Sequence, residues 1–252
     1  MAFIAQGKGL AFGVDTRRKE RYSLRQSRYY ALSLDISALA GAARREGRRL
    51  KLLDIGVGTG ICRRYIEVQP DADNIDYYGA DLQIYDSLYR PDDWQAIYVG
   101  DLMDGYPQAP DDFFDAVICE QVLEHVPELD TATRTLSRVL RPGGTLIVGV
   151  PTFPEGLHLV RKYVVPAIDR INPWAKRRGH VQAFSKRSFI AHLRRLTGLD
   201  VEKARGFRIV SGGILRPLEN REWWWRLNRR VGEAVPGLCV EIQVVARKAP
   251  QG

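Results

Sequence analysis

Apolar runs that end in an acidic residue recur along the middle of this chain. The first is Leu52–Asp54, and it is followed by Tyr77–Asp81, Ala96–Asp101 and Phe114–Glu120. Short apolar runs bounded by turn residues are typical of buried strands. Each of these runs therefore predicts a strand with a carboxylate at its end.

Helical periodicity separates these runs. Apolar residues recur at helical spacing from Ile61 to Val68, and again over Leu129–Leu140, where Asp130 or Thr131 is expected as the N-cap and Pro142–Gly144 as the turn that stops the helix. Strands that alternate with helices predict an α/β fold built on a parallel sheet.

The first strand leads into a loop with glycine at alternate positions, Gly56, Gly58 and Gly60. Glycine allows a sharp turn and a close approach of the backbone to a ligand. In an open α/β sheet, such a loop lies at the carboxyl end of a strand, where nucleotide cofactors bind. A dinucleotide fingerprint would need its third glycine at Ile61, and no phosphate loop of the Walker type occurs. The sequence therefore predicts a loop for an adenosine cofactor.

The string D-x-G-x-G-x-G resembles the first motif of the class I S-adenosylmethionine-dependent methyltransferases, in particular the small-molecule group that methylates quinones, sugars and lipids. Four further motifs follow in the family's order, so that the resemblance covers roughly residues 50–150. It implies a Rossmann-like, doubly wound sheet that is mostly parallel, with an antiparallel last strand and helices on both faces. The last two strands are expected at Val201–Ile209 and Cys239–Ala246.

The resemblance also implies roles in holding S-adenosylmethionine. Acids are expected at both ends of the cofactor, although strand-end capping is the alternative for Asp54 and Asp81. At the methionine end, Asp54 is expected to interact with the amino group, and Glu120 and Gln121 are expected near the methionine moiety. Gly56, Gly58 and Gly60 are expected to let the backbone approach the cofactor. Asp81 is expected to bind the ribose, and the adenine is expected to contact Leu82, Asp101 and Leu102.

Three parts of the chain are expected. Residues 1–49 form N-terminal lid or leader helices, in which Tyr22, Tyr29 and Tyr30 contact either the ligand or the core. Residues 50–150 form the cofactor-binding core. Residues 151–252 complete the same domain with a substrate-facing insertion, final helices and the last two strands.

Two histidines are candidates for a catalytic base. His180 lies in the expected substrate segment and is preferred, whereas His125 follows the fourth strand and is interpreted first as part of the scaffold. His158 is a weaker candidate, and His192 is expected to face solvent. No metal is predicted, because the acid and Asn cluster of metal-dependent relatives is missing.

Composition changes this picture only in part. The formal net charge is +8, which favours an anionic partner or a solvated basic surface, and no RNA-binding module string is visible. Three cysteines lie far apart and predict buried thiols in a cytoplasmic protein. No stretch approaches the ~20 apolar residues of a membrane span. The run Trp223, Trp224 and Trp225 must place at least one indole near the surface, as a substrate wall or a membrane contact.

The sequence therefore predicts a methyltransferase that acts on a small molecule, most simply at a hydroxyl of a sugar, lipid-linked or quinone-like acceptor. The alternatives are a nucleic-acid methyltransferase and a cofactor-binding or membrane-surface protein without catalysis. The oligomeric state is left open.

Overall fold

The structure is a computed structural model that describes residues 22–156, 159, 182–209 and 213–250. Seven strands form one sheet in the order β3-β2-β1-β4-β5-β7-β6. All neighbours are parallel except the pairs that involve β7. The strands are β1 (Leu50–Ile55), β2 (Ile75–Asp81), β3 (Ala96–Val99), β4 (Phe114–Glu120), β5 (Leu140–Pro151), β6 (Asp200–Phe207) and β7 (Glu241–Arg247). The predicted fold class, including the antiparallel last strand, is confirmed.

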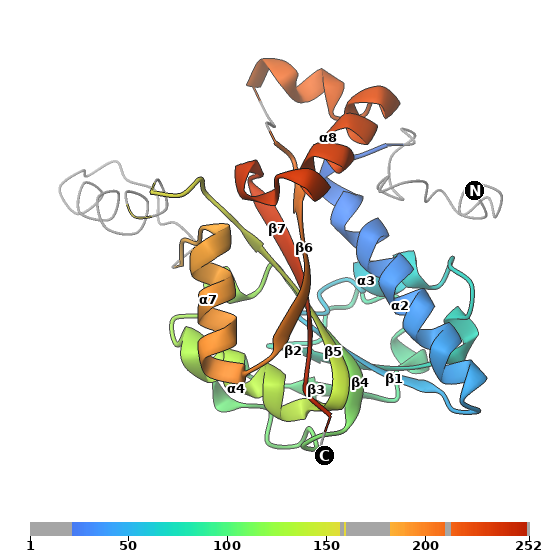
Figure 1. Ribbon diagram of the computed structural model, residues 1–252. Coiled ribbons are helices and arrows are strands. Elements are labelled where there is room, and N and C mark those ends of the chain that lie inside the picture. The colour runs from blue at the N-terminus through green and yellow to red at the C-terminus, as the bar shows by residue number, and fades with distance from the viewer. Residues whose placement is uncertain (1–21, 157–158, 160–181, 210–212, 251–252) are drawn as a thin grey trace.

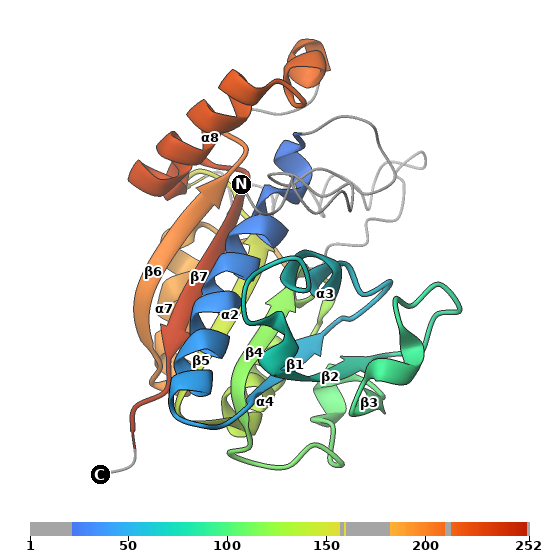
Figure 2. The same cartoon turned by 90° about the vertical axis from the view of Figure 1, so that its right-hand side faces the viewer.

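Helices cover both faces of this sheet (Figures 1 and 2). One face carries α2 (Ser27–Arg45) and α3 (Ile61–Ile66), and the other carries α4 (Leu129–Val139) and α7 (Lys186–Thr197). Helix α8 (Glu222–Ala234) lies beyond one end of the sheet. Short 3-10 segments complete the described part of the chain, at Leu24–Gln26, Ala72–Asn74, Pro91–Asp93, Leu102–Asp104, Leu123–His125, Gly213–Leu218 and Pro236–Leu238.

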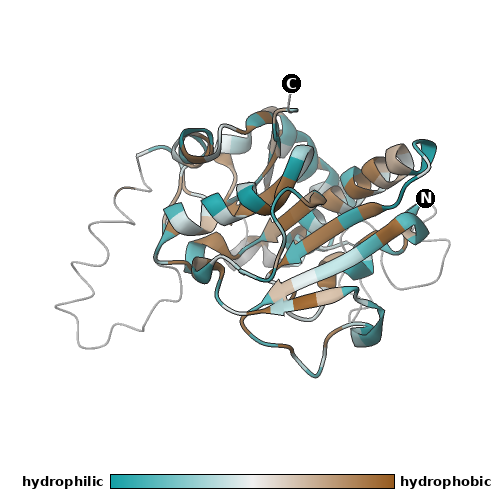
Figure 3. Ribbon diagram, turned by 90° about the horizontal axis from the view of Figure 1, so that it is seen from below, coloured by the Kyte–Doolittle hydropathy of each residue, from teal (hydrophilic) through white to brown (hydrophobic). Residues whose placement is uncertain are grey.

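The two helix layers explain why the central strands are apolar throughout. In β1, Leu52 packs toward α2 and α3, whereas Leu53 and Ile55 pack toward α4 and α7. Alternate residues of a strand point to opposite faces, so a sheet covered on both sides needs continuous apolar runs. Figure 3 shows hydrophobic residues along the strands between the helix layers.

Two local predictions are wrong at the ends of α4. The helix begins at Leu129 after Glu128, so that Asp130 lies within its first turn rather than at the cap. A carboxylate in the first turn still stabilises the helix through its interaction with the helix dipole. At the other end, the predicted turn at Pro142–Gly144 lies within β5, where the pairing with β4 shifts register. The helix ends at Val139 because the chain is already extended at Leu140.

The N-terminal segment, expected as lid or leader helices, contains the long helix α2, Ser27–Arg45. Its first turns carry aromatic residues that pack on the domain: Tyr29 lies against Tyr65 at 5.8 Å, and Tyr30 against Trp225 at 6.0 Å between ring centroids. Tyr22 also packs on Trp225, at 5.8 Å. These contacts agree with the alternative in which the tyrosines fasten the segment to the core.

Several arginines between residues 22 and 60 are ion-paired at the surface. Arg44 pairs with Asp71 at 2.8 Å, and Arg49 pairs with Asp76 at 2.6 Å. Such pairs fit the solvated-surface interpretation of these arginines better than a nucleic-acid footprint. No helix among the described residues has the length and hydropathy needed to cross a bilayer.

Candidate active site

A cavity of about 400 Å³ lies at the carboxyl ends of β1, β2 and β4. The sheet order reverses between β1 and β4, which is the point where open α/β sheets bind ligands. Most of the predicted cofactor residues line this cavity together with several that were not predicted. The lining residues are Gly56, Gly58, Asp81, Leu82, Tyr85, Asp101, Leu102, Met103, Tyr106, Glu120, Gln121, Val122, His125, Val126 and Pro127.

Glycine is required at the three positions of the loop for different structural reasons. All three have positive φ, with 78° at Gly56, 52° at Gly58 and 74° at Gly60. A Cβ on Gly56 would lie 2.4 Å from Val122 Cγ2, whereas a Cβ on Gly58 would meet nothing closer than 3.9 Å. Gly58 therefore leaves open space for a ligand beside the backbone. Gly60 packs under Tyr89 and does not line the cavity.

Asp81 and Asp101 lie at the ends of β2 and β3 and are held by backbone amides. Asp81 Oδ2 accepts a hydrogen bond from the N–H of Gly58 at 2.7 Å, and Asp81 Oδ1 accepts one from Leu82 at 2.7 Å. Asp101 Oδ1 accepts from the N–H of Met103 at 2.9 Å. Both carboxylates are thus fixed in place while still facing the cavity. The apolar side chain of Leu82 beside them is 65% exposed.

Asp54 and Glu120 lie deeper, at the ends of the adjacent strands β1 and β4. Asp54 is buried below the loop and does not line the cavity, and neither of its oxygens has a hydrogen-bond partner of normal geometry. Burial raises the pKa of Asp54 to about 7, partly offset by the neighbouring Cys62 thiol. Burial also raises the pKa of Glu120 to about 7, although Arg28 and Gln243 lower it. The sheet makes room for Glu120 at Gly149, where a Cβ would lie 2.3 Å from Glu120 Oε2.

Gln121 is the third polar residue at this end of the cavity. Its backbone is in the left-handed region at φ 58°, which is uncommon for a residue other than glycine. Its side-chain Nε2 is buried without a hydrogen-bond partner among the described residues. Strained backbone and an unpaired donor beside a cavity are features of ligand sites.

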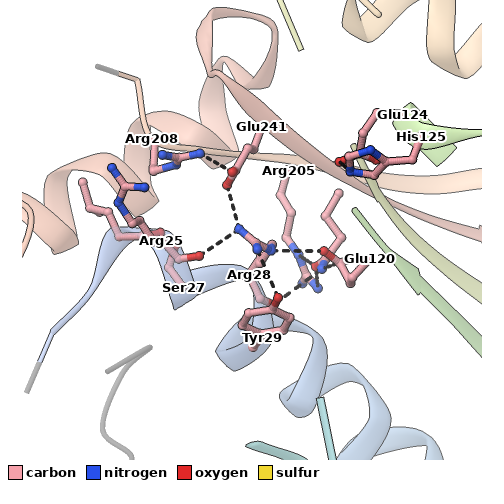
Figure 4. A network of polar contacts seen from close by, with 12 residues as sticks. Arg25, Ser27, Arg28, Tyr29, Glu120, Glu124, His125, Arg205, Arg208 and Glu241 are labelled. Atoms are coloured by element: carbon pink, nitrogen blue, oxygen red, sulfur yellow. Dashed lines mark hydrogen bonds and ion pairs between the residues drawn. The ribbon is translucent and has the colours of Figure 1, made fainter. Parts of the chain in front are cut away.

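A buried network connects Glu120 with the N-terminal helix and with β7 (Figure 4). Arg28 of α2 lies at its centre, with Nε 3.5 Å from Glu120 Oε2 and Nη1 3.1 Å from Glu241 Oε2. Arg208 pairs with the same Glu241, and Gln243 Nε2 donates to Glu120 Oε1. The arginine neutralises two carboxylates that are buried in the domain. Sequence reasoning missed Arg28, because the segment Arg17–Tyr30 contains many arginines and nothing in its pattern distinguishes this one.

Of the two catalytic candidates, the structure places only His125. It lines the cavity, its side chain is about half exposed, and its Nε2 lies 3.9 Å from Glu124 Oε1. Glu124 is buried, and this burial raises the pKa of its carboxyl to about 7. His180 and His158 lie outside the described residues. His192 interacts with Thr133 at 3.0 Å on the α4–α7 side and does not line the cavity.

Comparison with known proteins gives the family of the core. Residues 53–148 match the family described as methyltransferase domain. The fold and the order of its motifs are those of the class I S-adenosylmethionine-dependent methyltransferases, so the resemblance seen in the sequence is confirmed.

Among curated relatives, a ubiquinone biosynthesis O-methyltransferase of Pectobacterium carotovorum is 25% identical over 138 residues, which cover 46% of this chain and 57% of the relative. The chain thus spans little more than half the length of that relative. A solved structure of a putative methyltransferase from Bacillus halodurans is similar with a TM-score of 0.56 at 17% identity, covering 87% of this chain and 98% of the other. The [4+2]-cyclase SpnF is also similar, with a TM-score of 0.53 at 19% identity, covering 86% and 82%. The same fold is therefore found in proteins named for different reactions.

The residues present fit S-adenosylmethionine, the cofactor of this class. At one end of the cavity, which we call the adenosine end, Asp81 and Asp101 offer acceptors beside exposed Leu82. At the other, the methionine end, Glu120 has a buried oxygen without a hydrogen bond and Gln121 has a buried amide nitrogen without one. Asp54 lies just below, under the loop, and both of its oxygens lack a hydrogen bond. The ammonium group of an amino acid moiety can donate to such carboxylate oxygens, and its carboxylate can accept from the amide of Gln121. Among the described residues, no group of three or more His, Cys, Asp and Glu could hold a metal ion.

Proposed function

We propose that this chain transfers a methyl group from S-adenosylmethionine to a small-molecule acceptor, at a hydroxyl of a sugar, lipid-linked or quinone-like compound. The observation that carries the proposal is the convergence of Asp81, Asp101 and Glu120 around one cavity below the Gly56–Gly58 backbone. The name of the Pectobacterium relative supports a phenolic hydroxyl on a quinone-like ring.

Each end of the cavity has a distinct task in this proposal. Asp81 would accept hydrogen bonds from the ribose hydroxyls, while Asp101, Leu82 and Leu102 would hold the adenine. Glu120 and Gln121 would hold the amino acid moiety, with Asp54 acting through the loop. When bound, the cofactor supplies a methyl group on a positively charged sulfur to a nucleophile. Since this donor is already activated, positioning by the protein supplies much of the rate.

A hydroxyl acceptor must also lose its proton. His125 lines the cavity beside the methionine end and would accept this proton at a ring nitrogen. His180 remains a second candidate for the same role. An acceptor with an acidic phenol needs less help from a base than a sugar hydroxyl, so substitution of His125 should slow transfer to a sugar more than transfer to a phenol.

Calorimetric titration with S-adenosylhomocysteine tests the first part of the proposal. Gly56→Ala should weaken binding about 100-fold, because the new Cβ meets Val122 and the strain of such a contact is about 2–3 kcal/mol. Gly47→Ala is the matched control: Gly47 has a similar φ of 70°, but a Cβ there meets nothing within 4 Å. Absence of binding by the folded wild-type protein would exclude the proposed function.

The second part is tested by transfer of an isotopically labelled methyl group to a panel of catechols, sugars and amines. Label in a hydroxyl compound supports the proposal, and label only in amines corrects the acceptor class. Binding of S-adenosylhomocysteine without transfer to any of these compounds would instead favour a cofactor-binding protein with another activity.

A further inference from the structure

Helix α8 lies at the end of the sheet where the candidate active site opens. Strands β5 and β6 both pair antiparallel with β7 and therefore run in the same direction. Glu241 of β7 pairs with Pro151 and with Phe207, which are the carboxyl-terminal residues of β5 and β6. The chain leaves β6 at this end, and α8 lies just beyond it in both Figure 1 and Figure 2.

The inner face of α8 is firmly packed, which fixes the orientation of the helix. Trp225 is buried against Tyr22 and Tyr30, and Asn228 Oδ1 accepts a hydrogen bond from the N–H of Ile209 at 3.0 Å. One turn further, a Cβ on Gly232 would lie 2.0 Å from the carbonyl oxygen of Gly206. The helix therefore cannot rotate to bury its other face. Trp225 is too deeply buried to contact a membrane, so the predicted membrane contact through Trp225 is wrong.

The outer face of the same helix presents large apolar side chains. Trp223 is 58% exposed, and Leu227, one turn along on the same side, is 43% exposed. Ala234 extends this stripe two turns later. A tryptophan that is more than half exposed and adjoins an exposed leucine on one helix face is an unusual arrangement for a surface that meets only water.

Arginines flank this stripe. Residues 221–234 contain four arginines against two glutamates. Arg226 and Arg229 pair within the helix with Glu222 and Glu233, whereas Arg221 and Arg230 are exposed and make no ion pair with any residue that the structure describes.

An amphipathic helix with Trp and Leu on one face and arginines beside them is the type that lies in the interface of an anionic bilayer. We propose that the outer face of α8, formed by Trp223, Leu227 and Arg230 with Arg221 at the N-terminal end of the helix, docks this protein on an anionic phospholipid surface. The apolar side chains enter the headgroup region and the arginines contact lipid phosphates. A second copy of the chain fits this face less well, because it would bring arginine against arginine in a protein of net charge +8.

Docking through α8 would bring the end of the sheet that carries the cavity close to the bilayer. An acceptor held in the membrane, such as a lipid-linked or quinone-like compound, would then reach the site without leaving the lipid. This extension to the acceptor class rests on the proposed function, whereas the docking surface itself does not.

Co-sedimentation of the full-length protein with vesicles tests the docking surface. The protein should bind vesicles of phosphatidylcholine mixed with phosphatidylglycerol, bind pure phosphatidylcholine weakly, and dissociate at high salt. The pair Trp223→Ala and Leu227→Ala should lower binding at least about ten-fold through lost apolar burial. Arg221→Gln and Arg230→Gln should each lower it about five-fold, as expected for an arginine near an anionic surface.

A control variant carries Leu34→Ala with Arg45→Gln, two exposed residues of α2, and should bind vesicles like the wild type. Equal binding by the Trp223/Leu227 variant and the wild type would overturn the proposal, as would no binding to either type of vesicle. Self-association in solution that the Trp223/Leu227 variant abolishes, without vesicle binding, would assign the face to a second copy and also overturn it. S-adenosylhomocysteine affinity, measured on every variant, separates the outcomes: a protein that binds vesicles but not this ligand retains the docking surface and loses the proposed function.

Discussion

The two ends of the candidate cofactor pocket hold their carboxylates in different ways. At the adenosine end, Asp81 and Asp101 accept hydrogen bonds from backbone amides and remain partly exposed. At the methionine end, Asp54 and Glu120 are buried, and burial raises the pKa values of both to about 7. Both oxygens of Asp54 and Oε2 of Glu120 lack a hydrogen bond. The first arrangement is complete before a ligand arrives, and the second is not.

This difference indicates where ligand binding changes the protein. A neutral ribose and adenine can use the adenosine end as it stands, because its acceptors are already oriented. The methionine end needs a positive charge, which Arg28, Arg205 and bound protons provide in the unliganded structure. Buried carboxylates without partners reduce stability until a cation or a proton satisfies them. We therefore expect the methionine end to respond to charge and pH, and the adenosine end to respond to loss of individual hydrogen bonds.

The largest expected effect follows removal of the buried cation. Arg28→Ala leaves Glu120 and Glu241 without their shared partner and should lower the free energy of unfolding by about 3–5 kcal/mol. Denaturant titration measures this change. Arg45→Ala on the exposed side of the same helix is the control and should stay within about 0.5 kcal/mol of the wild type.

Combining Arg28→Ala with Glu120→Gln should recover part of the loss, because the buried carboxylate of Glu120 that Arg28 neutralised is then absent. If Arg28→Ala is as stable as Arg45→Ala, the network in Figure 4 does not stabilise the methionine end, and the comparison between the two ends fails.

The second effect tests the adenosine end. Asp81→Asn removes a charged acceptor and should weaken S-adenosylhomocysteine binding about ten- to 100-fold, the range of about 1.5–3 kcal/mol for hydrogen bonds to charged groups. Asp86→Asn, an exposed acid in the same loop that does not line the cavity, should bind normally. Calorimetry measures both. Equal affinities of the two variants would mean that Asp81 only caps the end of β2.

A pH series tests the contrast between the two ends directly. Since burial raises the pKa of Asp54 and Glu120 from 3.8 and 4.5 to about 7, the folded protein holds more protons than the unfolded chain between these values. The contribution of these groups to stability is therefore present at low pH and is lost as pH rises toward 7. The melting temperature of the unliganded protein should fall over this interval.

Ligand affinity should follow the opposite trend. An ammonium group at the methionine end favours the ionised acids, so S-adenosylhomocysteine should bind more tightly as pH rises toward 7, by at most about ten-fold per pH unit for each proton displaced. Groups that face Glu120 are Arg28, Arg205, Gln243 and Glu241. Glu120→Gln should flatten the pH dependence, while Asp81→Asn should leave its slope unchanged. An identical slope in Glu120→Gln and the wild type would contradict the assignment.

The contrast also explains how far the sequence could predict the site. Asp81 and Asp101 follow apolar runs, and their placement depends only on strand direction and on the local amides that they accept. Both could therefore be predicted from the pattern of the chain. The same pattern assigned Asp54 and Gly60 to the ligand, yet the structure places both outside the cavity lining. Asp54 lies beneath the glycine loop, and Gly60 packs against Tyr89.

The other features of the site depend on contacts between residues far apart in the sequence. Arg28 is 92 residues from Glu120 and Gln243 is 123 residues from it, so no local pattern joins them. The need for glycine at position 149 likewise arises from a neighbouring strand. At α8, composition predicted that the three tryptophans would differ in exposure, but only the packing of Trp225 on Tyr22 and Tyr30 determines which one faces outward.

The smallest expected effect concerns the apolar wall of the adenosine end. Leu82 is 65% exposed at the edge of the cavity, so Leu82→Ala should leave the free energy of unfolding nearly unchanged. A bound adenine would cover part of this side chain, and its loss should weaken S-adenosylhomocysteine binding about five-fold, or roughly 1 kcal/mol. Ile84→Ala is the matched control, because Ile84 is 55% exposed in the same loop but does not line the cavity. Calorimetry should show weaker binding only for Leu82→Ala. Equal affinity in both variants would mean that the adenine lies elsewhere in the cavity, and that the exposure of Leu82 has another cause.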